Sequence, residues 1–195
     1  PDRAEQNPED WWQAVVAAVR RVTSGRDVTR IAGIGFSGQM HGVTLLDSAG
    51  HPLHPSIIWA DQRSAPQVTE LTNLLGAESY ARIAGTLPAA GFMGPTLLWL
   101  KQHDPALLER AHQVILPKDY VRLKMTGEIA SDVSDAAATG LFDITQRDWS
   151  SAIIRHAGLP EHIFPAIKSS LAVAGYVQAA AAAAPGIPAG TMVVT

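Results

Sequence analysis

A short polar segment between two glycines carries the residue types with the most evident chemistry in this chain. It reads Ser-Gly-Gln-Met-His-Gly over residues 37–42, directly after an apolar run. We expect that run to be a strand, and ligand sites in α/β proteins form where strands end. An imidazole donates to and accepts from hydroxyl groups, and a thioether provides an adaptable apolar wall, so His41 and Met40 suit a polyol ligand. The alternative is a turn whose polar side chains only satisfy backbone groups.

A second candidate segment reads Trp-Ala-Asp-Gln-Arg-Ser over residues 59–64. Trp59 could stack on the C–H face of a sugar, while Asp61 and Arg63 could donate or accept charge-assisted hydrogen bonds. The alternative is a core tryptophan followed by a local Asp–Arg pair and a helix cap at Ser64. We favour the local pair for Arg63, and Trp59 stays open between the two interpretations.

Two carboxylates stand three residues apart at Asp132 and Asp135. Such a pair could hold Mg²⁺ or act in acid/base chemistry. Aspartate is also typical of helix N-caps, and the alanines at 136–138 follow like the start of a helix, so we favour the cap. Four histidines fall on expected helix faces or ends and are predicted to be surface residues: His103, His112, His156 and His162.

The glycines at 33, 35 and 38 match the G-x-G-x-x-G pattern of dinucleotide-binding folds. The context is wrong for that function, because the glycines lie within and after a strand and another strand follows. No acidic residue stands about 20 positions further on, where ribose binding needs one. We therefore expect these glycines to allow close backbone approach in a packed sheet.

The composition narrows the class of protein. The chain has 195 residues, 47% of them hydrophobic and 17% charged, which fits about one globular domain. Fifteen basic and 18 acidic residues leave a net charge of −3 without a basic run, so we expect no nucleic-acid partner. The absence of cysteine excludes disulfides and thiolate chemistry. No apolar stretch approaches the ~20 residues of a membrane span, and we expect a cytoplasmic location.

Apolar periodicity and cap residues predict the elements that must position these groups. Strands early and late, with helices between them, indicate an α/β architecture. Expected strands are residues 31–36, 43–46, 56–59, 141–144 and 192–194. Expected helices begin at Asn7-Pro8, Ser64, Gly94-Pro95, Asp104-Pro105, Pro117, Ser150 and Ala179. The first helix should end near residue 25, the helix from Ser64 near residue 74, and the helix from Pro117 at residue 127.

Several motifs together resemble a known family. Residues 31–63 run from Ile-Ala-Gly-Ile-Gly-Phe-Ser-Gly-Gln-Met-His-Gly to Trp-Ala-Asp-Gln-Arg, and the likeness continues through residues 91–99, Leu-Pro-Lys-Asp-Tyr at 116–120, residues 125–128 and residues 131–137. These segments closely resemble the first domain of the FGGY carbohydrate kinases, and the xylulose kinases among them. The chain departs at Thr96, where many relatives carry lysine.

The resemblance implies a ribonuclease H-like, actin-like fold, with a mixed central sheet and flanking helices. It implies that Met40 and His41 bind a ketose, D-xylulose, with Trp59 nearby. In the complete enzyme ATP and Mg²⁺ would serve the reaction, and no residue identified here binds either. The family's catalytic base is an aspartate expected just after Thr195, so no catalytic residue is assigned within this chain.

The resemblance also implies that residues 1–195 are most of an N-terminal sugar-binding domain, cut at both ends. A first strand hairpin with a phosphate motif and a C-terminal nucleotide domain would lie outside, so the chain alone should be inactive. Two alternatives stay open: another FGGY kinase acting on a different ketose or polyol, and a non-catalytic sugar-sensing or assembly module. The oligomeric state also stays open, with a homodimer of the complete protein as one alternative.

Overall fold

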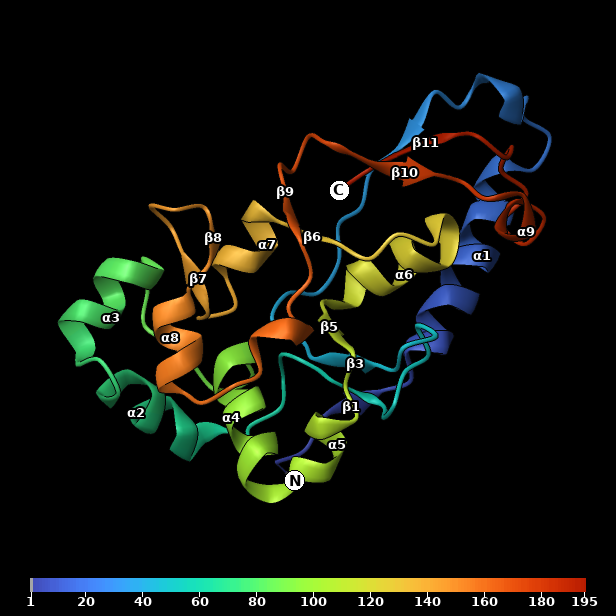
Figure 1. The fold of residues 1–195 in the computed structure, drawn as a ribbon. Coiled ribbons are helices and arrows are strands. Elements are labelled where there is room, and N and C mark those ends of the chain that lie inside the picture. Colours follow the sequence, from blue (N-terminus) through green and yellow to red (C-terminus); the bar gives the residue numbers. More distant parts are fainter. Residues whose placement is uncertain (1) are drawn as a thin grey trace.

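The computed structural model describes residues 2–195, and the expected α/β architecture is confirmed. The largest sheet of this part of the chain has three strands in the order β10 (Val173–Tyr176), β11 (Met192–Val194) and β2 (Gly33–Ile34). Strand β11 runs antiparallel to β10 and parallel to β2, so the sheet is mixed, as predicted. The first and last predicted strands are therefore neighbours (Figure 1).

The other strands form four two-stranded sheets. Three pairs are antiparallel: β1 (Glu5–Gln6) with β4 (Ser56–Ile57), β3 (Thr44–Leu46) with β5 (Gln113–Ile115), and β7 (Phe142–Asp143) with β8 (Asp148–Trp149). The fourth pair, β6 (Ser131–Asp132) with β9 (Ile167–Lys168), is parallel. The predicted strands at 43–46, 56–59 and 141–144 correspond to β3, β4 and β7, each slightly shorter than expected.

The helices of residues 2–195 are α1 (Pro8–Thr23), α2 (Ala65–Asn73), α3 (Ala77–Ala84), α4 (Met93–His103), α5 (Pro105–Glu109), α6 (Pro117–Thr126), α7 (Val133–Ala137), α8 (Ser151–His156) and α9 (Ala179–Ala182). Helices α1, α2, α5 and α6 begin with a proline in the first turn, as the sequence indicates, whereas α3 begins without a proline or a side-chain cap. Short 3₁₀ turns cover Val28–Arg30 and Glu161–Ile163. The Asn7 side chain accepts a hydrogen bond from the backbone N–H of Glu9, which confirms the first predicted cap.

The helices and strands (Figure 1) enclose two main clusters of buried apolar side chains. Helices α2, α3, α4 and α8 surround the larger core together with β3 and β4, and α1 packs against α6 beside the three-stranded sheet. The larger core includes the following fully buried side chains: Leu71, Tyr80, Leu97, Leu141 and Ile153. Strands β3 and β5 lie between the two regions and contribute to both.

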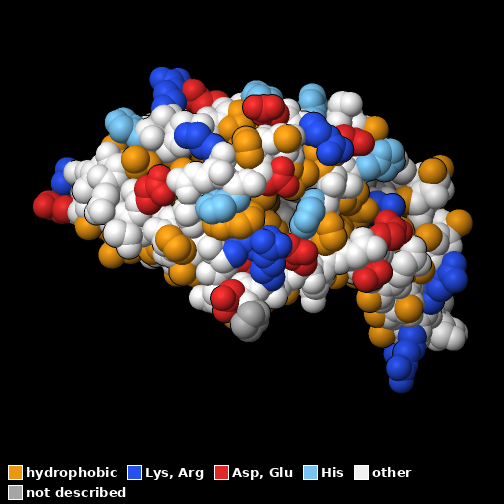
Figure 2. Space-filling view, turned by 90° about the horizontal axis from the view of Figure 1, so that it is seen from below, with side chains coloured by type: hydrophobic (Ala, Val, Ile, Leu, Met, Phe, Trp, Pro, Cys, Tyr) orange, Lys and Arg blue, Asp and Glu red, His pale blue; other side chains and the backbone are white. Residues whose placement is uncertain are grey.

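The surface is mixed in charge on the face shown in Figure 2, where acidic and basic side chains stand side by side. Within residues 2–195, no helix is both long enough and apolar enough to cross a membrane. The four histidines predicted to lie at the surface are exposed.

Candidate functional site

The polar segment 37–42 packs against the first turn of α6. A Cβ atom on Gly38 would lie 3.1 Å from Cβ of Lys118, and one on Gly42 would lie 2.8 Å from Cγ of Pro117. Only glycine fits at such separations without displacing its neighbour. The predicted close backbone approach is not seen at Gly33 and Gly35, where an added Cβ would lie 3.3 Å from the end of the Met192 side chain and 3.6 Å from the Val194 side chain. Gly38 and Gly42 thus allow the segment to pack between β2 and α6.

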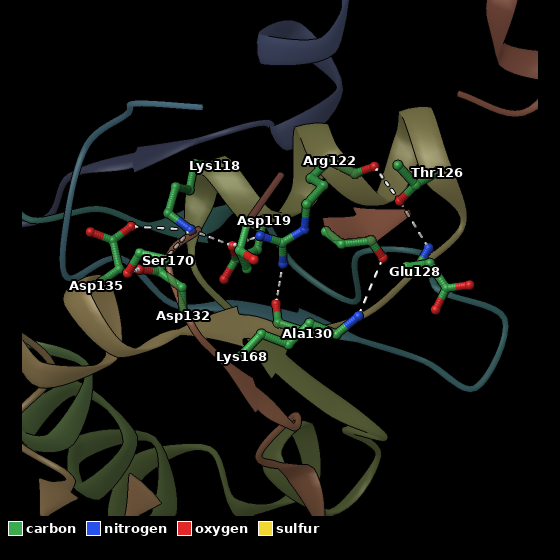
Figure 3. A network of polar contacts seen from close by, with 12 residues as sticks. Lys118, Asp119, Arg122, Thr126, Glu128, Ala130, Asp132, Asp135, Lys168 and Ser170 are labelled. Atoms are coloured by element: carbon green, nitrogen blue, oxygen red, sulfur yellow. Dashed lines mark hydrogen bonds and ion pairs between the residues drawn. The ribbon is translucent and has the colours of Figure 1, made fainter. Parts of the chain in front are cut away.

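Lys118 forms the centre of a buried ionic network (Figure 3). Its Nζ lies 2.7 Å from Oδ1 of Asp119, 2.8 Å from Oδ1 of Asp132 and 3.5 Å from Oδ2 of Asp135. The Lys118 side chain is 7% exposed. Burial alone would lower the pKa of Lys118, but the carboxylates of Asp119 and Asp132 outweigh it and raise that pKa. The lysine is therefore a fixed cation.

Arg122 extends the network one turn further along α6. Its Nη1 lies 3.0 Å from Oδ1 of Asp119, and its Nη2 donates to the backbone carbonyl of Ala130. The Arg122 side chain is fully buried, and that of Asp119 is 1% exposed. Two cations thus face three carboxylates, and Asp119 is enclosed between Lys118 and Arg122.

Asp132 joins the network to the connection between β9 and β10. Its Oδ2 accepts hydrogen bonds from the backbone N–H of Ser134 at 3.0 Å and from Oγ of Ser170 at 2.5 Å. Burial alone would raise the pKa of Asp132, but Lys118 and Ser170 outweigh it and hold that pKa below its ordinary value. The bond to Ser134 confirms that Asp132 caps α7.

A pocket of about 320 Å³ opens beside this network. Met40 lines the pocket from the polar segment, Lys118 and Asp135 line it from the network, and Ser170 and Thr195 line it from the connections around β10 and β11. Met40 is 50% exposed. Apolar, hydroxyl and charged groups therefore meet in one concave surface at the end of β11.

His41 is held in place by two contacts. Its ring stacks on Phe92 with centroids 4.0 Å apart and planes 7° from parallel. Its Nδ1 lies 2.6 Å from the carbonyl oxygen of Ala138, so Nδ1 carries the proton, since a carbonyl only accepts. In the neutral ring Nε2 is then an acceptor. The backbone of His41 has a φ of 68°, which is rare for a residue with a side chain.

Trp59 is 57% exposed, so the interpretation of it as a core residue is wrong. The local Asp–Arg pair is confirmed, because Nε and Nη2 of Arg63 donate to the two oxygens of Asp61 at 2.9 and 2.8 Å. The predicted cap at Ser64 is wrong in its chemistry. Ser64 precedes α2, but its Oγ accepts from the backbone N–H of Gly91 at 3.3 Å and makes no cap bond.

Sequence reasoning missed the part that Lys118 and Ser170 play in this site. The available signal was the position of Lys118, the second residue of a helix whose first turn is otherwise buried among apolar residues. A buried cation needs carboxylate partners. Asp132 and Asp135 were recognised as a pair, but their partner lies 14 and 17 residues away. Among residues 2–195, no group of three or more histidine, aspartate or glutamate side chains is arranged to hold a metal ion.

Comparison with known proteins identifies the family. The family model described as "FGGY family of carbohydrate kinases, N-terminal domain" matches residues 1–195. A xylulose kinase from Klebsiella pneumoniae is 39% identical over 185 residues, which are 95% of this chain and 38% of that protein.

Two solved structures are similar over the whole chain. A crystal structure of a "xyloylose kinase" from Brucella ovis has a TM-score of 0.89 at 36% identity, and that of a xylulose kinase from Rhodospirillum rubrum has a TM-score of 0.93 at 28% identity. The present chain covers 40% of each. These likenesses confirm the actin-like fold that the motifs implied. The chain belongs to the FGGY family of carbohydrate kinases and matches its N-terminal domain.

Proposed function

We propose that this chain is the sugar-binding side of a larger enzyme that transfers the γ-phosphoryl group of ATP to D-xylulose, giving D-xylulose 5-phosphate and ADP. The observation that carries the proposal is the 39% identity to a xylulose kinase over 95% of the chain. The chain spans 38% of that relative's length, so the remaining machinery would come from outside residues 1–195.

The sugar would bind at Met40 and His41, with Trp59 nearby. Met40 supplies an apolar wall to the pocket beside the Lys118 network. The contact between His41 and Ala138 fixes the ring and leaves Nε2 to accept a hydrogen bond from a sugar hydroxyl. An exposed tryptophan such as Trp59 offers a flat face to the C–H groups of a sugar.

Phosphoryl transfer to a hydroxyl group requires a base that accepts the hydroxyl proton. The family resemblance assigns this role to an aspartate just beyond Thr195. Thr195 lines the same pocket as Met40, and its Oγ1 donates to the carbonyl oxygens of Ser169 and Ala172 at 3.1 and 2.9 Å. These contacts fix the end of β11 beside the pocket, which supports placing the base there.

ATP and Mg²⁺ would supply the phosphoryl group and neutralise its charge in the complete enzyme. The residues described here do not fit a Mg²⁺ site. The carboxylates of Asp119, Asp132 and Asp135 already surround the cation of Lys118. This chain's residues therefore serve the sugar side, and we assign no step through the metal to them.

The proposal is tested by kinetics of the complete protein carrying His41→Ala. We expect the KM for D-xylulose to rise or turnover to fall, while the KM for ATP stays unchanged, because the proposal places His41 against the sugar and not against ATP. His112→Ala is the matched control, since His112 is exposed, and should leave both constants unchanged. Unchanged kinetics of His41→Ala would return His41 to a purely structural role.

A further inference from the structure

Asp135 differs from the other two carboxylates around Lys118 in how many of its acceptor sites are filled. Both oxygens of Asp132 are engaged, one by Lys118 and the other by Ser134 and Ser170. Asp132 therefore has little capacity left for a ligand.

Asp119 is closed off in another way. Its Oδ1 lies within 3.0 Å of both Lys118 and Arg122, and its side chain is 1% exposed. It does not line the pocket in the described part of the chain. A ligand in the pocket would meet neither Asp119 nor a free oxygen of Asp132.

Asp132 and Asp135 both line the pocket with Met40, but Asp135 keeps 18% of its side chain exposed against 4% for Asp132. Its one polar partner recorded within residues 2–195 is Lys118, whose Nζ is 3.5 Å from Oδ2, longer than a good hydrogen bond. A carboxylate has about four acceptor positions, so Asp135 retains most of them. They are available to a group inside the pocket.

The charges around Asp135 decide which kind of group that is. A cation at Asp135 would stand close to the ammonium group of Lys118, and an anion would face the carboxylates of Asp132 and Asp135. A neutral hydrogen-bond donor meets neither penalty. Burial removes water from the Asp135 carboxylate and raises its pKa, with Lys118 opposing that rise. A hydrogen-bond donor that takes the place of the lost water would offset this desolvation. A hydroxyl group is such a donor.

We propose that Asp135 accepts a hydrogen bond from a non-reacting hydroxyl group of the sugar and thereby helps to select the substrate. Lys118 positions Asp135 for this contact, and Met40 packs on the carbon side of the same sugar. This inference rests on the proposed function, since it takes the pocket to hold the sugar. It adds a polar determinant to Met40 and His41.

The test is a kinetic cycle on the complete protein with Asp135→Asn. The substrates are D-xylulose and its 1-deoxy, 3-deoxy and 4-deoxy derivatives, each lacking one hydroxyl group. We expect Asp135→Asn to raise the KM for D-xylulose by about tenfold or more, the scale of a hydrogen bond to a charged group, with the KM for ATP unchanged. With one of the deoxy sugars the wild type should show the same loss, and the substitution should add nothing further.

A structural role for Asp135 would instead raise the KM for all four sugars by the same factor. That result, or an unchanged KM for D-xylulose, would overturn the proposal. Asp10→Asn is the matched control, because Asp10 is an exposed aspartate in α1, and it should leave all constants unchanged. If Asp135→Asn lacks a cooperative thermal transition, Asp135→Glu replaces it, because this variant keeps the charge that faces Lys118. Its KM values for the four sugars should follow the same pattern as that expected for Asp135→Asn.

The two proposals fail in different ways. If the wild-type protein phosphorylates another polyol in preference to D-xylulose, the proposed substrate is wrong, and the same cycle with that polyol and its deoxy forms tests Asp135. If the wild type prefers D-xylulose and Asp135→Asn shows no selective effect, only the inference about Asp135 is wrong.

Discussion

The Nζ atom of Lys118 lies 2.8 Å from Oδ1 of Asp132 in a buried contact. This ion pair joins the first turn of α6 to the start of α7, and Asp132 continues the connection to Ser170 between β9 and β10. Because Gly38 packs against Lys118 as well, three segments distant in sequence meet at one lysine. Lys118 therefore links several of the segments that line the pocket.

Removal of that cation should be costly. In Lys118→Met the carboxylate of Asp132 loses its buried counter-charge and Asp119 keeps only that of Arg122. Breaking a buried ion pair from one side typically costs about 3–5 kcal/mol. We expect a loss of this size in the free energy of unfolding of the complete protein, measured by urea denaturation at neutral pH.

Lys124→Met provides the contrast. Lys124 pairs with Glu9 across 3.0 Å, but the two side chains are 35% and 41% exposed, and exposed pairs contribute about 0–1 kcal/mol. Equal losses in the two variants would show that burial does not set the strength of the Lys118 network.

Asp132→Asn and Asp135→Asn should differ in their effects on the free energy of unfolding at neutral pH. The pKa of Asp132 lies below its ordinary value of 3.8, so its stabilisation is present above that pH and is lost as the pH falls through the folded-state pKa. The pKa of Asp135 is raised, so its charged form disfavours the folded state above that pKa. Urea denaturation should therefore show a lower free energy of unfolding for Asp132→Asn, by about 1.5–3 kcal/mol, and no loss for Asp135→Asn.

The pH dependence gives an internal check on Asp132. The difference in stability between wild type and Asp132→Asn should shrink as the pH falls below 3.8, because the wild-type carboxylate becomes protonated there. A difference that stays constant from pH 7 down to the acid transition would contradict the ionic role of Asp132.

The backbone carbonyl of Trp59 lies close to Gly91, and this close approach predicts the effect of replacing Gly91 by alanine. Gly91 has a φ of 83°, and a Cβ there would lie 2.1 Å from the carbonyl oxygen of Trp59. Gly91→Ala should therefore lower the midpoint of thermal unfolding and raise the KM for D-xylulose, because the Trp59 backbone must move.

Gly25→Ala separates this clash from simple backbone strain. Gly25 has a φ of 70°, but a Cβ there meets nothing within 4 Å, so alanine should cost only the ~1–2 kcal/mol of a left-handed conformation. If Gly91→Ala and Gly25→Ala lower the free energy of unfolding equally and neither changes the KM for the sugar, the close approach of Trp59 to Gly91 does not contribute to function.

The elements that the sequence marks with local signals were predictable. Helices α1, α5 and α6 begin with proline in the first turn, and α6 ends at Gly127 with a φ of 74°. Helix α3 was not predicted, because it starts after Gly76 without a side-chain cap. Strand β5 was also missed, since three residues, Gln113–Ile115, carry too short a pattern to distinguish a strand from a helix entry.

The sequence suggested residues for a candidate site but not the contacts among them. Met40 and His41 stood out because polar and thioether groups followed an expected strand. The position of Lys118 among three carboxylates could not be predicted, because pairing across 14 and 17 residues depends on how α6 packs against β6 and α7. Trp59 stayed open between a sugar contact and a core position in the sequence, and its exposed side chain excludes the core position.

The most direct test of the central claim is ADP formation by the complete protein with D-xylulose, other ketoses, glycerol and gluconate offered one at a time. We predict the highest kcat/KM for D-xylulose, with D-xylulose 5-phosphate as the product identified by mass spectrometry, and no sugar-dependent ADP formation by residues 1–195 alone. A complete protein that forms ADP with none of these compounds, or that uses another of them more efficiently than D-xylulose, would contradict the proposed function.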